Sequence, residues 1–120
     1  MNPLKDQVLD DEMERLFTAF QLLRTLDREV PGQLVSAYFF IACRRQCHKQ
    51  ALEQGVGFAC SSGSRNSDWL TKHHRLKNGR GLQLITKERD PSDRRRCLLT
   101  LSAEGSALAD QMKSILWPER

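Results

Sequence analysis

The chain has few aromatic residues and no long apolar run. Only 7% of its 120 residues are aromatic. No apolar stretch approaches the roughly 20 residues that a membrane-spanning helix needs. The first six residues also lack the basic segment followed by an apolar stretch that is typical of a secretory signal. These absences argue against a membrane protein, so we expect no membrane partner and a cytoplasmic location.

Sequence signals of catalysis and metal binding are missing as well. The chain has no phosphate-binding glycine loop, no paired carboxylate motif, no nucleophile elbow and no CxxC pair. Cys43 and Cys47 are four residues apart, hence on one predicted helical face, and His48 and Cys60 are near in sequence. A zinc or thiol-sensing site is one interpretation, and small buried hydrophobic residues are the favoured one. We expect no enzyme activity, no cofactor and no metal, and leave a sensing role of these cysteines open.

Positive charge is abundant and unevenly distributed. The net charge is +4, yet residues 65–96 contain ten Lys and Arg against four Asp and Glu. Residues 1–30 have the opposite balance, with four basic against seven acidic residues. A basic segment attracts phosphate without needing sequence specificity. Residues 65–96 are therefore a candidate nucleic-acid surface, although charge alone is also consistent with a role in solubility.

Residues 90–105 combine a charged turn, a strand and the start of a helix. Pro91 and its acidic and serine neighbours favour a tight reversal of the chain. Three arginines, at 94–96, follow the turn directly, and the apolar segment 97–101 is typical of a half-buried strand. Ser102 is a candidate N-cap for the next helix. This order predicts a projecting hairpin whose guanidinium groups suit phosphates or a minor groove.

The same segment carries a resemblance to a known family. Asp-Pro-x-Asp-Arg-Arg, an apolar strand and then Leu-Thr-Leu-Ser-x-Glu-Gly resemble the wing and following helix of the MarR family of winged helix-turn-helix transcriptional regulators. The match spans about residues 61–116. It implies a mainly α fold with a small β-hairpin wing, in a single domain over residues 1–120. Residues 33–101 would form the DNA-binding winged helix, and residues 1–30 and 103–117 would form flanking dimerisation helices.

Apolar residues at three- and four-residue steps from Leu9 to Val30 predict a long amphipathic helix that Pro31 and Gly32 end. Its surplus apolar face indicates a partner, and the resemblance implies a homodimer in which the first and last helices pair. The alternative is that both apolar stripes close the monomer's own core. The last helix ends early, at Trp117, which shifts more of the expected interface to residues 8–30. The predicted dimer contacts are Leu16, Phe20, Leu23, Leu108, Met112 and Ile115.

A helix-turn-helix is predicted in the middle of the chain. After an apolar helix at about 33–46, a short helix at 49–54 ends at the glycines of 55–57. The recognition helix is expected from about residue 62 to Leu76, with Ser61 or Ser62 as its N-cap. Its base-reading candidates lie in its N-terminal part, where arginine suits guanine and asparagine suits adenine. The predicted DNA contacts of this helix are Ser62, Ser64, Arg65, Asn66, Asp68 and Lys72.

The wing supplies the second set of predicted DNA contacts. Residues 82–86 should form its outgoing strand and residues 86–89 should lead to the tip. The resemblance implies that Asp93 steadies the wing arginines through an ion pair, most plausibly with Arg95. The segment between recognition helix and wing tip is about two residues longer than in the common MarR-like pattern, which leaves the reach of the wing open. The wing contacts are Lys87, Arg89, Asp93, Arg94, Arg95 and Arg96.

Together these features predict a homodimeric transcriptional regulator that binds double-stranded DNA sequence-specifically. Its recognition helix would enter the major groove, and its wing would follow the backbone or minor groove. Two alternatives stay open at this point: a protein-interaction module and a nonspecific architectural DNA binder with the same fold. The sequence specifies neither the operator, nor the regulated genes, nor repression or activation. A small-molecule effector, which the resemblance suggests, is also left unidentified.

Overall fold

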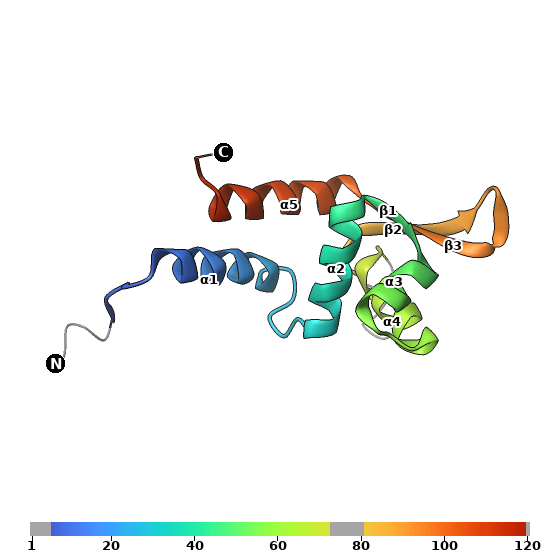
Figure 1. The fold of residues 1–120 in the computed structure, drawn as a ribbon, viewed down its shortest axis with the longest axis horizontal. Coiled ribbons are helices and arrows are strands. Elements are labelled where there is room, and N and C mark those ends of the chain that lie inside the picture. Colours follow the sequence, from blue (N-terminus) through green and yellow to red (C-terminus); the bar gives the residue numbers. More distant parts are fainter. Residues whose placement is uncertain (1–5, 73–80, 120) are drawn as a thin grey trace.

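The computed structural model describes residues 6–72 and 81–119. These residues form five helices and a small three-stranded antiparallel sheet, whose hairpin projects away from the helices (Figure 1). The elements are α1 (Asp11–Arg24), α2 (Gly32–Arg44), β1 (Gln46–His48), α3 (Lys49–Val56), α4 (Cys60–Leu70), β2 (Ile85–Asp90), β3 (Asp93–Leu101) and α5 (Ala103–Leu116). The predicted mainly α winged helix-turn-helix is confirmed. None of the helices in the described ranges is long and apolar enough to span a bilayer.

Helix α1 begins at Asp11, two residues after the predicted Leu9, and it ends earlier than predicted. Asp10 caps it by accepting a hydrogen bond from the third helical residue at 3.1 Å. The predicted continuation to Val30 is wrong, because the chain leaves the helix at Thr25. The Thr25 hydroxyl donates a hydrogen bond to a carbonyl oxygen in the last turn of the helix at 2.6 Å. The Arg24 guanidinium donates to the carbonyl of Arg28 at 2.9 Å. Val30 still packs against the core, which explains why the apolar spacing persists beyond the helix.

The sheet contains one strand that the sequence did not indicate. Arg45 adopts a left-handed conformation (φ 67°) that ends α2, and its carbonyl accepts from the amide of Leu101 at 2.8 Å. The next three residues form β1, which pairs antiparallel with β3 in the order β1-β3-β2. Cys47 therefore lies opposite Leu99 in the sheet, and the prediction that it shares a helical face with Cys43 is wrong.

Helices α3 and α4 form the helix-turn-helix. As predicted, α3 ends at a glycine, Gly57, in the left-handed region (φ 85°). Helix α4 then begins earlier than expected: its N-cap is Ala59, which makes no side-chain cap but accepts from the amide of Gly63 at 2.9 Å. The predicted caps Ser61 and Ser62 therefore lie inside the first turn of the helix.

The C-terminal end of α4 is set by a distant segment. The amides of residues 81–84 donate to the carbonyls of residues 69–72 at 2.8–3.2 Å, so these carbonyls are not available to continue the helix. Gly81 allows this approach, because a Cβ there would lie 1.7 Å from the carbonyl oxygen of Thr71. The helix consequently ends six residues before the predicted Leu76, which itself lies outside the described residues.

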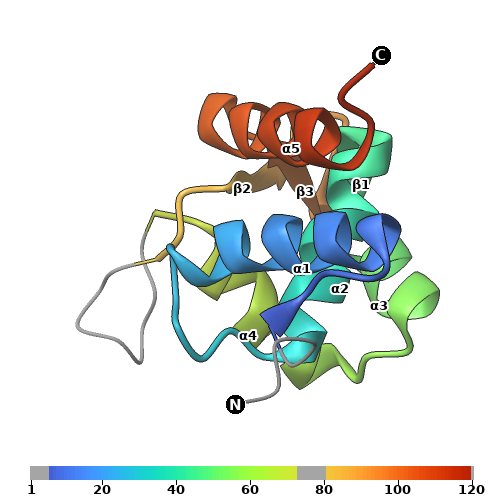
Figure 2. The same ribbon diagram turned by 90° about the vertical axis from the view of Figure 1, so that its left-hand side faces the viewer.

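The core lies between α2, the sheet and α5. Tyr38, which is 1% exposed, donates from its hydroxyl to the carbonyl of Gly105 at 2.7 Å and so ties α2 to the start of α5. Burial, and secondarily the negative charge of Asp110, raises the pKa of Tyr38 to about 12. Ser102 caps α5 as predicted, accepting from the amide of Gly105 at 2.9 Å. Helix α1 packs on α5, and the two lie side by side at one end of the molecule (Figure 2).

Candidate nucleic-acid interface

Arg65, one of the two residues predicted to read bases, is exposed in the middle of α4. Ser62, about one turn before it, and Ser64, directly before it, are half-buried. Arg65 therefore stays available for DNA, and its guanidinium can pair with two acceptors of a guanine. The structure is consistent with its predicted position on the outer surface.

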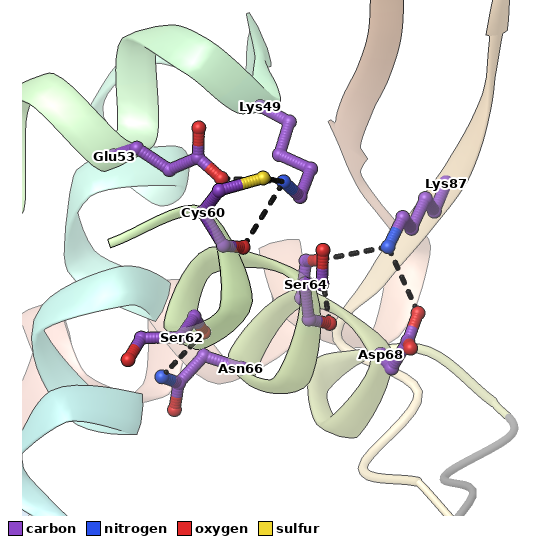
Figure 3. A network of polar contacts seen from close by, with 9 residues as sticks. Lys49, Glu53, Cys60, Ser62, Ser64, Asn66, Asp68 and Lys87 are labelled. Carbon is purple, nitrogen blue, oxygen red and sulfur yellow. Dashed lines mark hydrogen bonds and ion pairs between the residues drawn. The ribbon is translucent and has the colours of Figure 1, made fainter. Parts of the chain in front are cut away.

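Asn66, the other predicted base reader, points inward. Asn66 is 3% exposed, and its amide donates to the carbonyl of Ser62 at 2.9 Å (Figure 3). It also donates to the side chain of Gln33 on α2 at 3.3 Å. A buried polar group of this kind stabilises helix packing through its hydrogen bonds. We therefore correct the expectation: Asn66 joins α4 to α2 and has no surface with which to reach a base.

Asp68 and Lys87 were both predicted as DNA contacts and instead contact each other. The Lys87 ammonium lies 2.9 Å from a carboxylate oxygen of Asp68 and donates to the hydroxyl of Ser67 at 3.0 Å (Figure 3). The side chains of the ion pair are 22% and 18% exposed. This contact links the first strand of the wing to the recognition helix.

The turn of the wing forms where the motif predicted it, whereas its first strand, β2, covers Ile85–Asp90 and not the expected residues 82–86. The amide of Ser92 donates to a carboxylate oxygen of Asp90 at 2.8 Å, which closes the turn between β2 and β3. Asp93 accepts from both the backbone amide and the guanidinium of Arg95, each at 3.2 Å. These two hydrogen bonds lower the pKa of Asp93. The predicted Asp93–Arg95 ion pair is thus present in the structure.

The side chains of four arginines are exposed on the surface of the wing. Arg95 is 91% exposed even though it pairs with Asp93, so its guanidinium remains accessible to a phosphate. A groove of about 640 Å³ runs between the wing and helices α3 and α4. Arg89, Arg95 and Arg96 line the wing side of this groove, and Lys49 and Ser64 line its helical side. The exposed wing arginines are Arg89, Arg94, Arg95 and Arg96.

A second contact between wing and helices was not predicted. The imidazole Nε2 of His48, at the start of α3, lies 2.7 Å from Asp90 at the wing tip. Hydrogen bonding to His48, together with the amide of Ser92, lowers the pKa of Asp90. The two residues are 42 positions apart, and no local motif marks a pairing over that separation.

The remaining predicted contact of the recognition helix, Lys72, lies beyond the end of α4. It is exposed, and its carbonyl accepts from the amide of Gly81 at the base of the connection to the wing. His73, His74 and Arg75, which fall within the predicted range of this helix, lie outside the described residues. The basic contribution of α4 itself therefore rests on Arg65.

The predicted dimer contacts divide into two groups. Leu23, Leu108 and Met112 are 3%, 6% and 6% exposed and belong to the chain's own core, so the expectation of a free surface at these residues is corrected. Leu16 and Phe20 are 52% and 44% exposed. Ile115 is partly buried against the core. The exposed apolar surface called here the α1 face consists of Leu9, just before the helix, and of Met13, Leu16, Phe17 and Phe20 on α1.

The cysteines do not converge. Cys43 is exposed at the end of α2, Cys47 is buried in β1, and Cys60 is exposed at the start of α4. Within residues 6–72 and 81–119, no group of three His, Cys, Asp or Glu side chains could hold a metal ion. Cys60 lies 3.6 Å from the Lys49 ammonium, which also pairs with Glu53 (Figure 3).

Comparison with known proteins identifies the fold. No family model and no curated protein sequence matches the chain. Its structure is similar to that of the PcaV transcriptional regulator from Streptomyces coelicolor, with a TM-score of 0.59 and 19% identity over 90% of this chain and 79% of that chain. A MarR mutant from E. coli complexed with operator DNA gives a TM-score of 0.59 and 16% identity over 94% and 81%. Reduced AbfR bound to DNA gives 0.61 and 12% identity over 90% and 69%. The predicted resemblance to MarR-type regulators is confirmed as a likeness of fold.

Proposed function

We propose that this chain is a homodimeric transcriptional regulator that binds double-stranded DNA sequence-specifically and has no catalytic activity. The observation that carries the proposal is the exposure of Arg65 on α4, next to Ser64, which lines the groove that Arg89, Arg95 and Arg96 line from the wing. The helix thus presents a candidate base-reading side chain, and the wing presents several guanidinium groups. That combination suits a recognition helix in the major groove with a wing on the backbone or minor groove.

The proposal assigns different roles to the two ends of the chain. Residues 33–101 bind DNA, while the α1 face pairs with a second copy, supported by α5. Two recognition helices would then enter successive major grooves about 34 Å apart, which requires a two-fold symmetric site. The similarity to regulators solved with DNA supports this arrangement. DNA is the proposed partner, the cytoplasm the proposed location, and a small-molecule effector remains unassigned.

Selection of bound sequences from a random DNA pool tests the proposal most directly. We expect enrichment of a palindromic motif and tight binding to it in a mobility-shift assay. Equal binding to every sequence would instead indicate an architectural DNA binder. No binding to any DNA would refute the proposal and favour a protein-interaction module that docks through the α1 face.

A variant of the wing tests which surface is used. Arg94→Ala should weaken binding to all sequences and reduce the slope of log affinity against log salt by about one, because one phosphate contact is lost. Arg28→Ala is the matched control: it removes the same charge from an exposed position next to α1, away from the groove. We expect it to change neither affinity nor slope. An unchanged slope in folded Arg94→Ala would remove Arg94 from the interface.

A further inference from the structure

The side chain of Lys87 extends from the middle of the wing's first strand toward the recognition helix (Figure 3). In the sheet, Lys87 lies opposite Leu99 of β3, which is fully buried. This part of β2 therefore belongs to the base of the wing. Two hydrogen bonds hold the ammonium group, one to Asp68 at 2.9 Å and one to Ser67 at 3.0 Å. Lys87 therefore joins the strand to two consecutive residues of α4.

The anchor on α4 is rigid. Ser67 is fully buried, and its hydroxyl donates to the carbonyl of Ser64 at 3.1 Å while it accepts from Lys87. The hydroxyl is thereby held in one orientation by its own helix. The adjacent carboxylate of Asp68 offsets the charge of Lys87, so the pair as a whole offers little net charge to a phosphate.

We propose that Lys87 and Asp68 are positioning residues that set the orientation of the wing relative to the recognition helix and do not themselves bind DNA. This inference rests on the proposed function and replaces the earlier expectation that both residues touch DNA. A base contact by α4 and a phosphate contact by the wing must be made simultaneously. A fixed angle between the two elements lowers the conformational cost of making both.

The two roles predict opposite effects for one substitution. If Lys87 contacts phosphate, Asp68→Asn removes a repulsive acid and releases Lys87, so DNA affinity rises. If the pair positions the wing, Asp68→Asn lowers affinity. We expect a loss of roughly 3- to 10-fold for both Asp68→Asn and Lys87→Met, and a double variant no weaker than the weaker single one, as for residues that act as a unit.

Glu88→Gln is the matched control for the loss of an acid. Glu88 is the neighbour of Lys87 on β2, is exposed, and lines the same groove. Its substitution should leave DNA affinity unchanged or raise it. Lys87→Met should also keep the wild-type salt slope, because no phosphate contact is lost, whereas Arg94→Ala should reduce it.

Amide hydrogen exchange without DNA provides a test that is independent of the proposed function. In folded Asp68→Asn and Lys87→Met, we expect faster exchange of the β2 amides than in the wild type, with the protection of α2 retained. Wild-type levels of β2 protection in both variants would overturn the proposal, as would an Asp68→Asn variant that binds DNA as well as Glu88→Gln. If the wild type binds no DNA, the proposed function fails, while the exchange data still decide whether this pair holds the wing.

Discussion

Replacement of Phe20 by aspartate tests the proposed assembly. Phe20 is the C-terminal member of the α1 face and is 44% exposed in the single chain. For a phenylalanine of about 200 Å², this leaves about 90 Å² to be covered by a partner. At about 25 cal/mol per Å², covering it contributes about 2 kcal/mol for each copy, or about 4 kcal/mol for a two-fold interface that contains it twice. Since about 1.4 kcal/mol corresponds to a factor of ten, the dimer should weaken by roughly 1,000-fold.

The introduced carboxylate adds to this effect, because an unpaired charge in an apolar contact is costly to desolvate. Analytical ultracentrifugation over a concentration series measures the change, and far-UV circular dichroism establishes that the variant is folded. We expect a wild-type dimer at micromolar concentration, a monomeric Phe20→Asp chain, and loss of tight binding to a two-fold DNA site.

Phe39→Asp is the matched control. Phe39 is 43% exposed, almost the same as Phe20, but it lies on α2 in the body of the domain. It should leave the dimer intact. A monomeric wild type, or equal dimerisation of wild type and Phe20→Asp, would refute the reasoning; equal weakening by both substitutions would show that the interface is not the α1 face.

Four further substitutions test separate parts of the structure. Arg65→Ala should reduce the discrimination between DNA sequences by about 1–3 kcal/mol. Asn66→Ala should instead lower the free energy of unfolding by about 1–3 kcal/mol and leave the sequence preference unchanged. Selection of bound sequences measures the first effect, and denaturant titration measures the second. Gly81→Ala should cost at least about 1–3 kcal/mol of stability, because its Cβ meets backbone that must move, and a wild-type melting temperature would contradict this. Asp90 has a lowered pKa, so its contribution to stability is retained above the ordinary value of 3.8 and lost as the pH falls through the lower folded-state value. The Ser92 amide should therefore titrate by NMR with a midpoint below 3.8 and lose this titration in Asp90→Asn; a midpoint at or above 3.8 would refute the assignment.

The sequence by itself determined the features that depend on neighbouring residues. Turns and helix caps are made by side chains that reach backbone groups two or three positions away, so their chemistry is visible in a short motif. Ser102 caps its helix as predicted, and Asp10 makes a cap of the same local kind. The pairing of Asp93 with Arg95 spans only two residues and was predicted from the resemblance of the wing motif. The apolar spacing likewise indicated helices before the wing and after it.

Only the tertiary structure decided which side chains remain on the surface. Arg65 and Asn66 are adjacent and equally polar in the sequence, yet the packing of α4 against α2 exposes the first and buries the second. In the same way, an apolar stripe on α1 does not reveal which of its members face α5. Leu23 enters the core and Phe20 stays outside because α5 covers only part of that helix.

The ends of elements and the contacts between them were also decided by distant partners. Helix α4 ends where the amides of residues 81–84 donate hydrogen bonds to the carbonyls at its C-terminal end. Strand β1 forms because β3 lies beside it and pairs with it. The pairs of Lys87 with Asp68 and of His48 with Asp90 join residues 19 and 42 positions apart. Hydrogen bonds and ion pairs act over a few ångströms in space, whatever the separation along the chain. A pattern read along the chain therefore identifies the wing and the recognition helix, while the folded core determines how they are held together.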